Sequence, residues 1–65
     1  METYDLHIYF MDGKEEYAVA INEHMVRDNV LHCYVRKYSG LEYNALNRII
    51  LSSFPIHNIR KYIQE

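Results

Sequence analysis

The feature that most constrains the fold is a pair of alternating segments on either side of Asp12-Gly13. Apolar side chains recur at every second position in residues 4–10 and again in residues 15–21, which is the pattern of half-buried β-strands. Asp-Gly is a preferred pair for a two-residue hairpin turn, in which both residues adopt positive φ. The sequence therefore predicts an antiparallel hairpin over residues 4–21.

A two-residue turn also determines which residues of the hairpin face each other. Ile8 would lie opposite Tyr17, and Leu6 would lie opposite Val19. In this register one face collects the large apolar side chains of both segments, namely Tyr4, Leu6, Ile8, Phe10, Tyr17, Val19 and Ile21. A shift of one residue would turn the second strand over, so this register predicts that Tyr17 and Val19 point into the core.

A polar segment and a third strand follow the hairpin. Residues 22–29 are mainly polar and end in Asp-Asn, which predicts a connecting loop. Residues 30–38 are rich in β-branched and aromatic side chains, which favours a strand. Leu31 and Cys33 would then face the core, and Ser39-Gly40 would end the strand.

The last 25 residues allow two interpretations. In the helical one, residues 39–42 match a capping box and apolar residues recur four positions apart after it. In the β interpretation, residues 48–54 form a strand, residues 55–58 a tight turn and residues 59–63 a closing strand. Periodicity does not separate helix from strand in short apolar runs, so both interpretations stay open at this point.

The order of these elements resembles small SH3-like or Sm-like β-barrels. The resemblance rests on the Asp12-Gly13 hairpin, the third strand ending near Gly40 and residues 49–59, where such barrels commonly place one turn of 3₁₀ helix between their last two strands. It implies a mostly-β fold of about five antiparallel strands in a single domain, residues 1–65. The alternative is an α+β fold, with a three-stranded antiparallel sheet followed by one or two C-terminal helices. The chain lacks the RNA-binding loops of Sm proteins and has no tryptophan for an SH3-type peptide groove, so neither activity is carried over.

Composition and charge narrow the class of protein. Hydrophobic residues make up 49% of the chain and charged residues 25%, a globular balance. The apolar runs are too short for a membrane span, and the acidic N-terminus lacks a signal-peptide pattern, so we expect a cytoplasmic protein with no membrane partner. Residues 1–28 carry seven acids and two bases, whereas residues 29–65 carry five bases and two acids. This distribution disfavours a uniformly basic nucleic-acid binder.

The residue types that act as catalysts or metal ligands in other proteins do not form catalytic or metal-binding patterns in this sequence. The four histidines have no close ligand spacing, and the single cysteine, Cys33, is predicted on an apolar strand face. Glu15 and Glu16 are neighbours on a strand, so their carboxylates point to opposite faces. There is no glycine-rich phosphate loop and no nucleophile elbow. We therefore expect no enzyme activity, no cofactor and no metal site.

Seven tyrosines in 65 residues are the unusual feature of the composition. Tyrosine suits protein interfaces because it offers a large apolar area and one hydroxyl. A domain of this size without disulfides commonly gains stability by oligomerisation. The sequence therefore predicts a non-enzymatic protein-interaction module that self-associates, with a contact surface formed by Tyr9, Tyr34, Arg36, Arg60 and Tyr62.

This size and style are typical of phage or mobile-element accessory proteins in bacteria, which bind a host protein. Two alternatives stay open. One is a small nucleic-acid or nucleotide binder that uses the basic C-terminal half, and the other is a structural subunit of a larger assembly.

Overall fold

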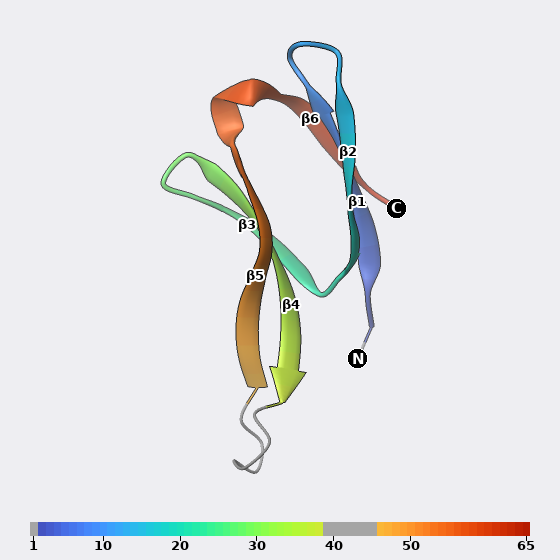
Figure 1. The fold of residues 1–65 in the computed structure, drawn as a ribbon, viewed down its shortest axis with the longest axis vertical. Helices are drawn as coiled ribbons and strands as arrows, with labels where there is room; N and C mark the ends of the chain where they lie inside the picture. Colours follow the sequence, from blue (N-terminus) through green and yellow to red (C-terminus); the bar gives the residue numbers. More distant parts are fainter. Residues whose placement is uncertain (1, 39–45) are drawn as a thin grey trace.

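The computed structural model describes residues 2–38 and 46–65, which form six β-strands and one 3₁₀ helix (Figure 1). The elements in chain order are β1 (Tyr4–Phe10), β2 (Glu15–Ile21), β3 (Glu23–Arg27), β4 (Val30–Tyr38), β5 (Leu46–Pro55), the 3₁₀ helix η1 (Ile56–Asn58) and β6 (Ile59–Gln64). The prediction of a mostly-β fold is confirmed. Among the described residues, η1 is the only helix, and no helix is long and apolar enough to cross a membrane.

The strands form two three-stranded antiparallel sheets, with the orders β2-β1-β6 and β3-β4-β5. Within the described residues no strand pair joins the two sheets, so the predicted barrel is not closed. β2 and β3 are separated only by Asn22, where the chain bends from one sheet into the other. The Asn22 side chain holds this bend, because its amide donates to the carbonyl of Glu2 (2.8 Å) and its oxygen accepts the backbone N–H of Arg36 (2.8 Å).

The segment predicted as a loop, residues 22–29, contains the strand β3, so that prediction is wrong. β3 is a short edge strand, and its polar composition reflects the exposure of an edge. It joins β4 through Asp28 and Asn29, whose φ angles are 53° and 61°. Two consecutive positive φ angles are typical of a two-residue hairpin turn, and Asp and Asn tolerate them better than most residues.

The helical interpretation of the C-terminal part is wrong for residues 46–64, which form β5, η1 and β6. β5 pairs with β4 from Leu46↔Tyr38 to Pro55↔Val30, so long-range ladder bonds stabilise an extended conformation over its whole length. The predicted tight turn at residues 55–58 contains η1. The capping-box residues 39–42 lie outside the described residues.

The turn of the β1–β2 hairpin holds three residues, 11–13, rather than two. The backbone N–H of Phe10 donates to the carbonyl of Lys14 (2.8 Å), and the carbonyl of Phe10 accepts the N–H of Gly13 (3.1 Å). Of the three turn residues, Gly13 alone has positive φ, at 88°. This is the hairpin loop in which glycine takes the left-handed position after a tight turn. The hairpin is therefore confirmed, whereas the predicted two-residue turn is wrong.

The extra turn residue reverses the faces of β2. His7 pairs with Tyr17, so Ala18 points inward in place of Tyr17 and Val19. Tyr17 is 50% exposed and Val19 is 58% exposed. The prediction that these two side chains enter the core is therefore wrong, and the cause is a register shift of one residue.

A bulge near the end of β2 restores the predicted register at Ile21. The shift occurs between the pairs made by Leu6 and Tyr4 of β1, and Tyr4 pairs with Ile21. Ala20 lies in the bulge with φ at 55°, and its backbone N–H donates to a carboxylate oxygen of Asp5 (2.9 Å). The bulge turns the chain back, so that Ile21 is fully buried.

The core lies where the two sheets cross. Its fully or nearly fully buried members are Leu6, Ile8, Ala18, Ile21, Leu31 and Cys33. A ring of half-buried apolar side chains packs around them, namely Tyr4, Phe10, Phe54, Ile56, Ile59 and Tyr62. The far halves of β4 and β5 extend past this core as a two-stranded arm, which gives the molecule its elongated shape of 44 × 24 × 12 Å (Figure 1).

Candidate functional site

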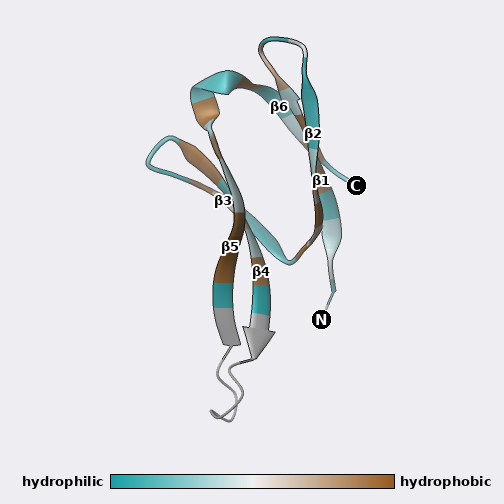
Figure 2. Ribbon diagram, viewed as in Figure 1, coloured by the Kyte–Doolittle hydropathy of each residue, from teal (hydrophilic) through white to brown (hydrophobic). Residues whose placement is uncertain are grey.

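The exposed side of β5 carries a run of apolar side chains. β5 is an edge strand of its sheet, and it carries three consecutive exposed apolar residues: Ile49 (44% exposed), Ile50 (53%) and Leu51 (52%). Figure 2 shows this stretch as the longest strongly hydrophobic segment of β5. We call these three residues the β5 apolar edge. An exposed apolar edge strand is a template for pairing with another strand.

The register explains why these three side chains cannot be buried together. Ile49 pairs with Val35 and Ile50 pairs with Tyr34, so Ile49 and Ile50 point to opposite faces of the sheet. Leu51 falls at the bulge between Cys33 and Tyr34 of the partner strand. The β5 apolar edge therefore presents apolar surface on both faces of the sheet and along the free edge of β5.

A charged cluster lies beside this edge on the same sheet. Glu23 of β3 accepts hydrogen bonds from Arg36 (2.5 Å) and Arg48 (2.6 Å). Arg36 and Arg48 lie directly opposite each other on β4 and β5, a placement in which like charges repel. Glu23 compensates this repulsion, and the hydrogen bonds from Arg48 and then Arg36 hold the pKa of Glu23 below its usual value.

Tyr34 is covered by the same cluster. The guanidinium carbon of Arg48 lies 4.7 Å from the centre of the Tyr34 ring, and Tyr34 is only 7% exposed. A cation over an aromatic face is an attractive contact. Glu23 of β3, Tyr34 and Arg36 of β4 and Arg48 of β5 therefore join the three strands of this sheet, and Tyr34 offers little surface for a partner.

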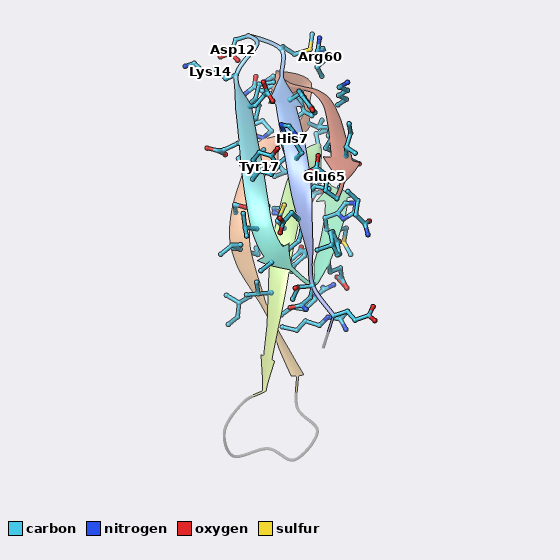
Figure 3. The ribbon with its side chains drawn as sticks, turned by 90° about the vertical axis from the view of Figure 1, so that its right-hand side faces the viewer. His7, Asp12, Lys14, Tyr17, Arg60 and Glu65 are labelled. Atoms are coloured by element: carbon cyan, nitrogen blue, oxygen red, sulfur yellow. The ribbon has the colours of Figure 1, made fainter. Side chains whose placement is uncertain are left out.

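The other sheet, β2-β1-β6, carries an aromatic stack on its outer face, the face turned away from the core (Figure 3). The His7 ring lies between the rings of Tyr9 and Tyr17, with centroid distances of 4.1 Å on each side. His7 is consequently 7% exposed although it faces outward. We call these three residues the aromatic stack.

Carboxylates meet both ring nitrogens of His7. Glu15 Oε1 lies 2.7 Å from Nε2, and Glu65 Oε1 lies 3.4 Å from Nδ1. Carboxylates only accept hydrogen bonds, so the doubly protonated imidazole is the form that can donate to both. Partial desolvation, followed by the negative charges near the ring, chiefly that of Glu65, raises the pKa of Tyr17.

The basic end of this face lies over Tyr9. Lys61 Nζ lies 4.7 Å from the centre of the Tyr9 ring, and the guanidinium carbon of Arg60 lies 5.9 Å from it. Tyr62, the next residue of β6, points the opposite way and packs half-buried against the core. Its ring meets the edge of His24 at a centroid distance of 5.6 Å.

The five residues predicted as one contact surface therefore fall into three places. Tyr9 and Arg60 come together on the outer face of β2-β1-β6, and Tyr34 and Arg36 come together on the other sheet. Tyr62 is directed toward the core. The structure does not bring the five into one patch.

Sequence reasoning missed the two surfaces described above. The run at residues 49–51 contained the signal for the β5 apolar edge, because three consecutive apolar side chains on a strand cannot all face one core. The aromatic stack was missed because the predicted two-residue turn placed Tyr17 inside.

Other chemistry-bearing groups form no site within the described ranges. In residues 2–38 and 46–65, no three or more of His, Cys, Asp and Glu are placed to hold a metal ion. Cys33 is buried, and desolvation raises the pKa of its thiol. A hollow between the β1–β2 turn and η1 is lined by Phe10, Met11, Asp12 and Asn58. Comparisons of the chain with protein-family models, with curated proteins and with solved structures gave no match.

Proposed function

We propose that the chain is a small, non-enzymatic protein-interaction module that self-associates through the β5 apolar edge. The observation that carries the proposal is an edge strand of ten residues with three consecutive half-exposed apolar side chains. Single exposed apolar residues are normal on protein surfaces, whereas a contiguous exposed apolar strip marks an interaction site. The engagement of Arg36 and Arg48 by Glu23 is the reason we favour a protein partner over a nucleic acid.

A second copy of the chain fits this edge. Two β5 strands related by a two-fold axis at Ile50 would pair antiparallel, with Ile49 of one copy opposite Leu51 of the other. Such a contact is self-complementary and closes as a dimer. Full burial of an aliphatic side chain contributes about 1.5–3 kcal/mol. These side chains are about half exposed, so each would contribute about 1 kcal/mol on each copy, in addition to new backbone hydrogen bonds.

We further propose that the chain is related to SH3-like and Sm-like barrels. Support comes from the way β2 continues into β3 through Asn22, as one bent strand shared by two sheets. If this bent strand is counted once, five strands remain, and η1 stands between the last two. A host protein bound by a phage-encoded module of this kind would use the same β5 apolar edge.

The test is the solution mass measured by light scattering over a concentration series at high salt, where surface charges are screened. We expect the wild-type chain to reach a dimer and Ile50→Lys to remain a monomer. Val26→Lys is the matched control, because Val26 is a similarly exposed apolar residue (45%) on β3, the opposite edge of the same sheet. A wild-type monomer at every concentration, or a dimer that Ile50→Lys leaves intact, contradicts the proposal.

A further inference from the structure

The sheet β2-β1-β6 has two edges of opposite chemical character. The register places Glu15, Tyr9 and Lys61 in one row across the three strands. The neighbouring row on the same outer face consists of Tyr17, His7 and Ile63. The β2 edge therefore ends in an acid and an exposed aromatic ring, whereas the β6 edge ends in a base and an exposed aliphatic side chain.

The β2 edge presents an acidic side chain and an exposed aromatic ring. Tyr17 is 50% exposed, and partial desolvation, followed by nearby charges that include those of Glu65, Glu15 and Asp5, raises the pKa of its hydroxyl. Glu15, whose side chain is half-exposed, is the group on this edge that attracts a cation, and Tyr17 offers the apolar surface of its ring beside it. Figure 3 shows Tyr17 on the outer face beside His7, at the β2 side of the sheet.

The β6 edge offers such a cation together with apolar surface. Within one chain Lys61 already lies over the face of Tyr9, at 4.7 Å. Ile63, two residues further along β6, is 42% exposed on the same face. In the described part of the chain β6 pairs only with β1, so its other edge has no strand against it.

We infer that β6 of one copy of the chain docks against β2 of a second copy, head to tail. β1 runs antiparallel to both neighbours, so β2 and β6 run in the same direction, and copies stacked side by side would pair these strands in parallel. Lys61 then lies next to Glu15 of the following copy, and Ile63 lies next to Tyr17 of the following copy. Each of the two rows of one copy therefore continues into the corresponding row of the next copy.

Charge favours this pairing. Lys61 of one copy meets Glu15 of the next in the same contact that sets Ile63 beside Tyr17, so opposite charges and apolar surface match together. The contact joins different surfaces of the two copies, so it extends into a chain or a ring instead of closing at a dimer. It does not use the β5 apolar edge and is therefore independent of the proposed function.

The first experiment isolates this contact in the Ile50→Lys background, which removes the proposed β5 pairing. Sedimentation velocity would be run over a concentration series at about 0.01 M and about 1 M salt, where the screening length falls from about 30 Å to about 3 Å. We expect species larger than a monomer at low salt that grow with concentration, and a monomer at high salt. A monomer at low salt overturns the inference and leaves the β5 dimer of the wild-type chain untouched.

The second experiment reverses charges at the contact. Lys61→Glu is expected to abolish the low-salt species. The matched control Lys14→Glu has the same change in net charge at an exposed residue directly after the β1–β2 turn, and it is expected to retain them. Glu15→Lys is expected to abolish them as well, and an equimolar mixture of the Lys61→Glu and Glu15→Lys chains is expected to restore association.

Because Glu15 also contacts His7, circular dichroism should first verify that each variant is folded. Glu15→Gln serves as a milder variant, because it removes the charge of Glu15 and weakens association without introducing repulsion. Unchanged association of folded Lys61→Glu overturns the inference. Failure of two folded, charge-reversed chains to associate when mixed also overturns it.

Discussion

Gly13→Ala is expected to destabilise the fold through the backbone alone. Gly13 has φ at 88°, and a methyl group at its Cα would meet no atom within 4 Å. The cost is therefore conformational and not steric crowding with neighbours. An L-residue in the left-handed region is disfavoured by about 1–2 kcal/mol, which for a domain of this size corresponds to a fall in Tm of roughly 4–15 °C.

The assay is thermal and urea unfolding followed by circular dichroism, at one fixed protein concentration because self-association adds stability. Gly13→Asn is the matched comparison, since asparagine tolerates positive φ better than alanine, and we expect it to recover part of the loss. An unchanged Tm for Gly13→Ala, or equal losses for alanine and asparagine, would refute the three-residue turn and the register that follows from it.

Two further predictions follow from the backbone and the charged cluster. Ala20→Gly is expected to raise the unfolding free energy by up to about 1 kcal/mol. Relief of a positive φ is worth about 1–2 kcal/mol, which exceeds the roughly 0.5–1 kcal/mol entropic cost of glycine. A lower unfolding free energy in urea would contradict the bulge at Ala20. Glu23→Gln is expected to be less stable than the wild type at neutral pH. The folded-state pKa of Glu23 is lowered by Arg48 and Arg36, so its contribution is present above the unfolded carboxyl value of about 4.3 and disappears as the pH falls through the folded value. Unfolding curves at several pH values should therefore converge in acid, and a pH-independent difference contradicts the cluster.

The sequence predicted the elements better than their register. Alternation identified β1 and β2, and β-branched and aromatic density identified β4, because these signals are local. Asp12-Gly13 is compatible with turns of two or three residues, and the difference of one residue decides which face of β2 is buried. The choice between the two turns depends on the core as a whole. The core accommodates Ala18, and the bulge returns Ile21 to the buried face.

The candidate surfaces were harder to predict because they depend on pairing between distant strands. Tyr9 meets Arg60 only because β1 pairs with β6. Tyr34 was expected to be an exposed contact residue, but Arg48 of β5 covers its ring, and no local pattern indicates that contact. β3 was missed because a short polar edge strand has the composition of a loop.

Hydrogen exchange across a concentration series tests self-association through the β5 apolar edge, because it reports which backbone amides become protected when copies meet. We expect amides of β5 around Ile50 to exchange more slowly as concentration rises at high salt, whereas amides of β3, the opposite edge of the same sheet, should not change. Association without added protection at β5, or equal protection of β3 and β5, would contradict pairing through the β5 apolar edge.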